Sequence, residues 1–170
     1  MTIEDIDYLV ETYVQAAVNS ELAGADGVEV HAAHGYLVQQ FLSPYTNKRT
    51  DEYGGSMETR CRFLVRILTG IRAAVSRDFV VGARINGNDF VEGGNDLAAC
   101  TEIAKYLEPY GDYFYVASGG YASAPTMIEP CYSPEGWRKN QAKTIKAAVN
   151  VPVIAVNTIK HPETAERFLQ

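Results

Sequence analysis

Four short apolar segments recur along the chain, and a helical pattern separates each from the next. The segments are 27–31, 79–85, 113–117 and 151–156, and each is rich in β-branched or aromatic residues. Helices are expected after a capping box at Thr2, after caps at Ser56 and at Asn95 or Asp96, around Trp137–Val149 and from Pro162, with a long loop over 32–55. Continuously apolar strands that alternate with helices are typical of a parallel sheet covered by helices.

Polar residues at the strand ends separate two such architectures. A doubly wound sheet usually carries a glycine-rich first turn, and no G-x-G-x-x-G follows any of these strands. A (βα)8 barrel places functional polar groups where its strands end, and His31, Arg84 with Asn86, Ser118 and Asn157 stand there. The sequence therefore predicts an α/β fold of the (βα)8 TIM-barrel type.

The strand count limits how much of a barrel this chain can form. Four strands are fewer than a (βα)8 barrel requires over its roughly 250 residues. We therefore expect residues 1–170 to form a single partial barrel domain with about four parallel strands and flanking helices. Its open sheet edges predict either further strands outside this sequence or a homo-oligomer, because bare edges pair readily with other chains.

Charge and composition exclude several classes of partner. The net charge is −6, and no cluster of Lys and Arg is present to neutralise phosphates, so we expect no nucleic acid. No apolar run approaches the roughly 18 residues that cross a bilayer, and the acidic start does not resemble a signal peptide. Three widely spaced cysteines fit reduced packing thiols. We expect no membrane partner and a cytoplasmic location.

Three motifs resemble a known family. They are GADGVEVHAAHGYL at 24–37, QFLSP at 40–44 and NKRTDEYGGS at 47–56. They resemble the NADH:flavin oxidoreductase family, which includes old yellow enzyme, 2,4-dienoyl-CoA reductase, trimethylamine dehydrogenase and the enoate reductases, all of them FMN-binding (βα)8 barrels. The resemblance covers nearly the whole chain and implies barrel strands of about four to seven. Segment 121–137 is most similar to the enoate-reductase and bile-acid or steroid-CoA branch.

The resemblance implies an ene-reductase that acts on a small-molecule α,β-unsaturated carbonyl or thioester. His31 and His34 occupy the positions that donate hydrogen bonds to the substrate's carbonyl oxygen, where negative charge develops. Tyr36 matches the tyrosine that protonates the α-carbon as the catalytic acid. Tyr121 is expected at the mouth of the substrate site.

Cofactor contacts follow from the same resemblance. Arg84 matches an arginine at the N1 and C2-carbonyl edge of FMN, and Asn157 lies where relatives bind the FMN phosphate through the backbone. NADH or NADPH is the implied reductant. An iron–sulfur cluster is implied only for segments that this sequence lacks, and we expect the chain alone to bind flavin weakly and to be inactive.

The residues leave other interpretations open. Arg84 could form an ordinary ion pair with Asp26 or Glu29, because an unpaired charge at the end of an apolar strand is costly. The chain could be a non-catalytic half-barrel that serves as a structural or dimerising module. It could also be a metal-dependent hydrolase that uses His31 and His34, although no third ligand with zinc spacing is evident and we expect no metal.

Overall fold

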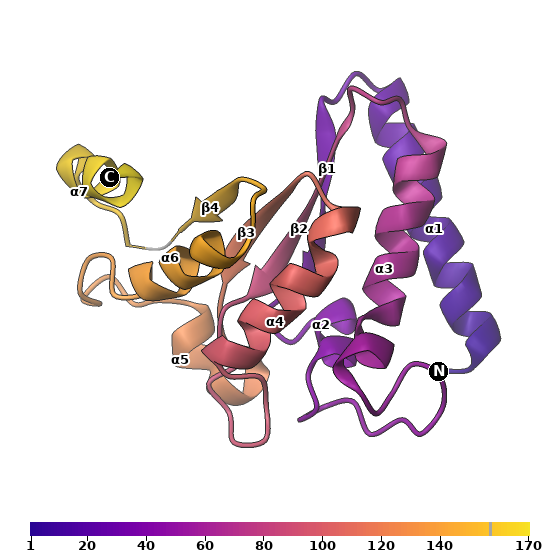
Figure 1. Ribbon diagram of the computed structural model, residues 1–170, viewed down its shortest axis with the longest axis horizontal. Coiled ribbons are helices and arrows are strands. Elements are labelled where there is room, and N and C mark those ends of the chain that lie inside the picture. The colour runs from indigo at the N-terminus through magenta and orange to yellow at the C-terminus, as the bar shows by residue number, and fades with distance from the viewer. Residues whose placement is uncertain (157) are drawn as a thin grey trace.

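Four parallel strands form the sheet, in the order of the chain. The computed structural model describes residues 1–156 and 158–170. Strands β1 (Gly27–Ala32), β2 (Val80–Asn86), β3 (Tyr113–Ala117) and β4 (Val153–Ala155) lie in the order β1-β2-β3-β4 (Figure 1). The four predicted strands are confirmed, although β4 is shorter than 151–156.

The predicted helices are also present. They are α1 (Ile3–Leu22), α3 (Met57–Ala74), α4 (Leu97–Leu107), α6 (Lys139–Ala148) and α7 (Pro162–Leu169). Thr2 and Asp5 form the expected capping box, and the side chains of Ser56 and Asp96 accept the backbone N–H groups of Thr59 and Ala99. Trp137 precedes α6 rather than lying within it. None of the helices in the described part of the chain is long and apolar enough to cross a membrane.

The expected loop over 32–55 is wrong in one segment, because α2 (Leu37–Leu42) lies within it. This short helix buries Val38, Phe41 and Leu42. Side chains outside the helix cap its last carbonyls. Asn47 donates to the Phe41 carbonyl, and the side chains of Arg60 and Asn95 donate to the Leu42 carbonyl at 3.0 and 3.1 Å. Tertiary contacts therefore make this helix. Short elements also follow β3, with a 3-10 turn at Tyr121–Ser123 and α5 at Ala124–Met127.

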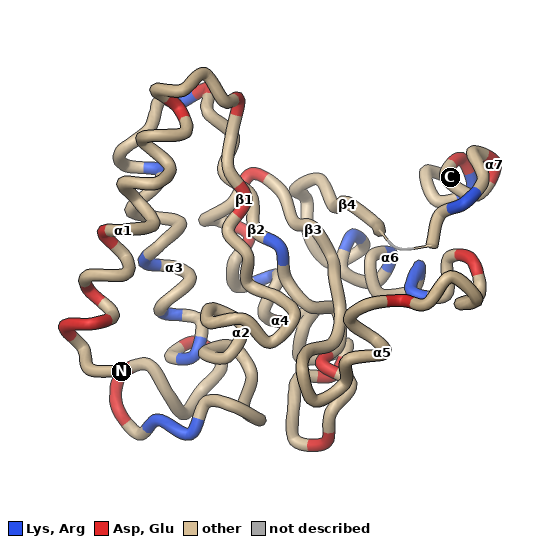
Figure 2. The backbone as a smooth tube through the Cα atoms, turned by 180° about the vertical axis from the view of Figure 1, so that it is seen from behind, with Lys and Arg blue, Asp and Glu red and all other residues tan. Residues whose placement is uncertain are grey.

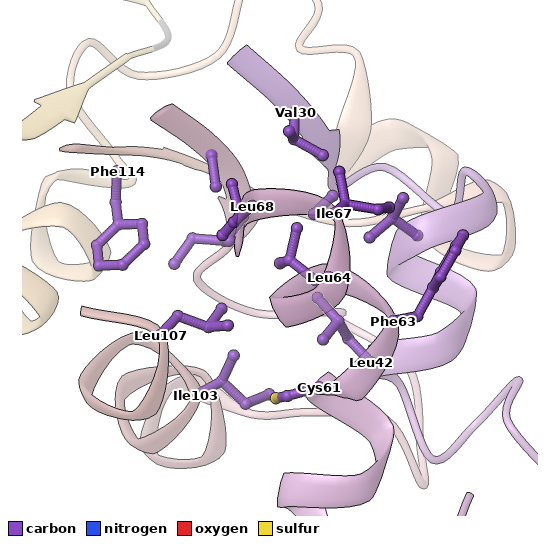
Figure 3. Packing of buried hydrophobic residues seen from close by; sticks show 14 of the residues in the cluster. Val30, Leu42, Cys61, Phe63, Leu64, Ile67, Leu68, Ile103, Leu107 and Phe114 are labelled. Atoms are coloured by element: carbon purple, nitrogen blue, oxygen red, sulfur yellow. The ribbon is translucent and has the colours of Figure 1, made fainter. Parts of the chain in front are cut away.

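The two faces of the sheet differ because successive side chains of a strand point to opposite sides. Helices α1, α3, α4 and α6 lie along one face (Figure 1), and a buried cluster fills the space between helices and sheet (Figure 3). Val30, Leu64, Leu68 and Phe114 belong to this cluster. Figure 2 shows the molecule from the opposite side of the sheet. The strand registers place Glu29, His31, Arg84, Tyr113 and Tyr115 together on that opposite face.

The cysteines follow the packing prediction only in part. Cys61 and Cys100 are buried, and burial raises the pKa of the Cys61 thiol to about 12. Cys131 is exposed, so its assignment as a packing residue is wrong. It lies in the loop between α5 and α6, outside the buried cluster.

Candidate functional site

The carboxyl ends of β1 and β2 gather most of the predicted site residues. His31 pairs in register with Arg84, and Arg84 pairs in register with Tyr115 on β3. The chain then turns sharply after β1 and brings His34 and Tyr36 back to His31. The ring centroid of His31 lies 5.2 Å from that of His34 and 5.0 Å from that of Tyr36, both in edge-to-face orientation.

The turn fixes the proton position on His31. The backbone N–H of Ala33 donates to His31 Nδ1 at 3.3 Å. A neutral imidazole that accepts at Nδ1 carries its proton on Nε2. Burial lowers the pKa of His31, and the neighbouring Arg84 charge lowers it further. At neutral pH this side chain is therefore an uncharged donor through Nε2–H.

His34 has an unusual backbone conformation with a φ of 62°, a region that few residues other than glycine adopt. Its backbone N–H donates to Asn86 Oδ1 at 3.2 Å, which holds the turn against the end of β2. Burial lowers the pKa of His34 to about 4, with further contributions from the charges of His31, Arg84 and Arg138. His34 is therefore also neutral at pH 7.

Two tyrosines form the outer side of this cluster. Tyr36 is 45% exposed and Tyr121 is 64% exposed, and their ring centroids are 5.7 Å apart. Gly35, with a φ of 75°, allows the close approach, because a Cβ there would lie 3.1 Å from Tyr121 Cδ2. The structure thus brings Tyr121 to Tyr36 and places both at the solvent side of the two histidines.

Arg84 lies on the uncovered face with incomplete polar contacts. The guanidinium carbon of Arg84 lies 3.8 Å from the centroid of the Tyr115 ring, and its Nε is 3.9 Å from Glu29 Oε1. That ion pair is longer than a hydrogen bond. Buried Arg84 Nε has no hydrogen-bond partner among the described residues. The expected ion pair of Arg84 with Glu29 is therefore present but long. Of the two carboxylates proposed as partners, Glu29 forms the ion pair rather than Asp26.

This orphaned donor is the observation that tests the fit of a flavin. A buried N–H without a partner costs free energy comparable to a lost hydrogen bond, so it favours a ligand with an acceptor. The N1 and C2-carbonyl edge of FMN offers acceptors of that kind and carries the negative charge of the reduced flavin. Arg84 therefore fits the cofactor that the sequence implies. Asn157, the other predicted cofactor residue, lies outside the described residues.

A buried polar network supports the turn, and Asn86 is the one member that the sequence placed among the polar residues at the strand ends. Asn86 Nδ2 donates to Asp89 Oδ1 and to the Gly119 carbonyl, both at 2.9 Å. Gln39 Nε2 also donates to Asp89 Oδ1 at 2.9 Å, and the Asn95 N–H donates to Asp89 Oδ2 at 2.9 Å. The polar run Asn-Gly-Asn-Asp directly after an apolar strand was the available signal for Asp89.

A second buried group was missed near the end of the β3–α6 connection. Arg138 is 5% exposed, and its Nε lies 3.0 Å from Glu129 Oε1. Thr158 donates to the other oxygen of Glu129. Burial lowers the pKa of Arg138 although Glu129 opposes the shift. The Thr158–Glu129 hydrogen bond ties the loop after β3 to the segment after β4, whereas the Arg138–Glu129 pair lies within the β3–α6 connection.

A metal centre receives no support from the geometry. Among the described residues, no group of three or more His, Cys, Asp or Glu side chains is placed to hold a metal ion. His31 and His34 instead lie beside Arg84, whose positive charge opposes cation binding. The arrangement suits recognition of an electron-rich oxygen by neutral donors.

A parallel sheet of this type, with neutral donors and an arginine where its strands end, defines a site suited to a flavin-dependent oxidoreductase. The chain belongs to the NADH:flavin oxidoreductase / NADH oxidase family, whose model matches residues 1–170. An NADH oxidase of Thermoanaerobacter brockii is 45% identical over 170 residues, 99% of this chain and 26% of that protein. An NADPH dehydrogenase of Halalkalibacterium halodurans is 37% identical over 171 residues, 100% of this chain and 48% of that protein.

A solved structure of 2-naphthoyl-CoA reductase in complex with 2-naphthoyl-CoA superposes with a TM-score of 0.92 at 38% identity. The match covers 98% of this chain and 26% of the solved chain. Structural neighbours of this kind are TIM-barrel flavoenzymes, so the predicted fold class is confirmed. The chain spans about a quarter to a half of the length of the curated relatives it matches. The family assignment favours neither the dimerising module nor the metal hydrolase.

Proposed function

We propose that the protein containing this chain is an FMN-dependent ene-reductase acting on activated α,β-unsaturated carbonyl or thioester compounds. The observation that carries the proposal is the close grouping of two neutral imidazoles and a tyrosine beside Arg84. FMN, reduced by NADH or NADPH, would supply the hydride for the β-carbon of the substrate. The residues of this chain bind and orient the substrate and supply its proton.

The two histidines are proposed to bind the substrate's carbonyl oxygen. His31 would donate through Nε2–H, because Nδ1 is occupied by the Ala33 N–H. Donors that are fixed before the reaction stabilise negative charge on that oxygen as it develops, and one such donor is typically worth about 10²–10³ in rate. Two neutral imidazoles suit this role, because each keeps an N–H and neither requires a counter-ion.

Tyr36 is proposed as the acid that protonates the α-carbon. Its ring lies 5.0 Å from His31, so the phenol is near the atoms that the histidines would hold. Tyr121, 5.7 Å from Tyr36, is proposed to bind the substrate at the mouth of the site. Arg84 is proposed to hold FMN through its orphaned Nε–H, and the backbone at Asn157 to contact the FMN phosphate.

Single-turnover reduction of 2-cyclohexen-1-one tests this function in the full-length, flavin-loaded enzyme. Tyr36→Phe keeps the ring and removes the acid, so we expect enone reduction to slow by about 10²-fold or more. Reduction of the flavin by NADH or NADPH should change little. Tyr8→Phe, at an exposed position on α1, is the matched control.

The outcomes separate clearly. An unchanged rate in Tyr36→Phe would remove its role as acid. Failure of the unaltered enzyme to reduce 2-cyclohexen-1-one would reject the ene-reductase assignment, although family membership would stand.

Three wider expectations belong to the same proposal. The four strands are proposed to be strands four to seven of the complete barrel. A homo-oligomer through open sheet edges and a cytoplasmic location remain predictions. The size-exclusion mass of the full-length protein would test the homo-oligomer, and cell fractionation would test the location.

A further inference from the structure

A cleft adjoins the candidate site on the side of the two tyrosines. Its volume is about 230 Å³, and it lies between α2, the loop after β2 and the loop after β3. Gln39 and Gln40 line it from α2, Val91 from the β2 loop, and Gly120, Tyr121 and Ala122 from the β3 loop. A cavity of about 150 Å³ accommodates benzene, so the cleft has room for a phenyl ring or a short alkyl chain.

The cleft and the candidate site share Gly35 and Tyr121 in their walls. Gly35 lines the cleft and lies between His34 and Tyr36 in the sequence. Gly35 also approaches the backbone of Gly120 and the ring of Tyr121 closely, so the two loops share one wall. The cleft is therefore lined by Tyr121, the residue predicted at the mouth of the substrate site, and reaches the turn that carries His34 and Tyr36.

The lining chemistry restricts what can enter. None of the described lining residues is Lys, Arg or His, and most of the exposed lining surface is apolar. Asp89 is the charged side chain in the lining, and Gln39, Asn86 and the Asn95 N–H already occupy its oxygens. An anionic group would lose its hydration without gaining a counter-charge, which is strongly unfavourable.

We propose that this cleft is a specificity subsite for an uncharged aryl or alkyl substituent of the unsaturated carbonyl substrate. The assignment rests on the proposed function for its substrate class. Binding by the cleft itself does not depend on turnover, so the two can be tested apart. The subsite discriminates against substituents that carry a carboxylate or phosphate.

Ala122 is the position at which to alter the cleft. It is exposed in the 3-10 turn after β3, so a larger side chain there does not disturb the core. Ala122→Phe fills the cleft, and Ala122→Lys adds the missing positive charge. Ala124→Phe is the matched control, because Ala124 is also exposed but does not line the cleft.

Calorimetric titration of the full-length, flavin-loaded enzyme is the test. The probes are 4-phenylbutan-2-one and its para-carboxylate. We expect the unaltered enzyme to prefer the neutral ketone by about tenfold or more. Ala122→Phe should weaken the neutral ketone about fivefold or more through lost apolar burial, while Ala124→Phe should not. Ala122→Lys should reduce the ratio of the affinity for the neutral ketone to the affinity for the carboxylate.

Each outcome decides the proposal. Equal binding of the two ketones, no binding of the neutral ketone, or equal effects of Ala122→Phe and Ala124→Phe would overturn it. Turnover of 2-cyclohexen-1-one is recorded separately. If the enzyme fails to reduce it while the binding pattern holds, the ene-reductase function fails and the cleft stands as a binding site for uncharged aryl groups.

Discussion

Replacing the buried carboxylate of Asp89 should destabilise the protein, even when the replacement is the amide of asparagine. Asp89 is 4% exposed, and three donors point at it: Gln39 Nε2 and Asn86 Nδ2 at Oδ1, and the Asn95 N–H at Oδ2. Asn86 cannot turn its amide around, because its Oδ1 accepts from the His34 N–H while Nδ2 donates to the Gly119 carbonyl. In Asp89→Asn, an NH₂ group would therefore face at least one N–H donor.

The cost of this substitution follows from its most favourable orientation. The new amide would keep its oxygen toward Gln39 and Asn86 and turn its NH₂ toward the Asn95 N–H. One hydrogen bond to a charged group is then lost, worth about 1.5–3 kcal/mol, and a buried donor is left without an acceptor. The two bonds that remain are weakened by loss of the charge. We expect the free energy of unfolding to fall by about 2–4 kcal/mol.

Urea unfolding of the full-length protein, followed by circular dichroism, measures this loss as a lower midpoint at unchanged slope. Asp96→Asn is the matched control. It removes one charge from a neighbouring residue, but asparagine is as good a helix cap as aspartate, so the midpoint should barely move. A loss below about 1 kcal/mol in Asp89→Asn would refute the reasoning, because the donors would then have other acceptors.

Three further predictions test the site and the core. The pKa of His34 is lowered to about 4 from an ordinary 6.5, so the folded state binds fewer protons than the unfolded state between these pH values. The contribution of His34 to stability is therefore present above pH 6.5 and is lost as the pH falls toward 4. The ring NMR signals of His34 should not titrate between pH 8 and 5.5. Arg84→Gln should weaken FMN binding about tenfold or more in a fluorescence titration, whereas Arg62→Gln, at an exposed ion pair, should not. Phe114→Ala should lower the free energy of unfolding by about 3–5 kcal/mol, because the ring is fully buried; a change below about 1 kcal/mol would contradict its place in the core.

Local patterns predict the sheet and the meeting of His31 with Arg84. Each strand is a short apolar run, and strands joined by helical crossovers run parallel, so their carboxyl ends reach the same edge of the sheet. His31 and Arg84 both occur late in their strands and pair in register. Residues 53 positions apart in the chain could therefore be placed side by side without a structure.

Contacts that depend on packing could not be predicted in this way. Helix α2 is short, and the side chains that cap its last carbonyls come from the following loop, from α3 and from the loop before α4. No local pattern reveals caps supplied from so far along the chain. Its position matters for the site, because Gln39 on α2 both binds Asp89 and lines the cleft.

The same helix explains how the His34 turn can hold its strained backbone. Asn86 stabilises the turn by accepting the His34 N–H, and Asp89 fixes Asn86. Asp89 is in turn fixed by Gln39, so α2 and the two strand-end loops support one conformation of the turn. A left-handed residue persists where surrounding contacts determine it. We therefore expect Gln39→Leu to loosen the His34 turn without touching it, seen as faster exchange of the His34 amide hydrogen. Gln15→Leu is the control, since Gln15 is exposed on α1 and its side chain donates to Asn19, away from the turn; equal exchange rates in the two variants would contradict this chain of support.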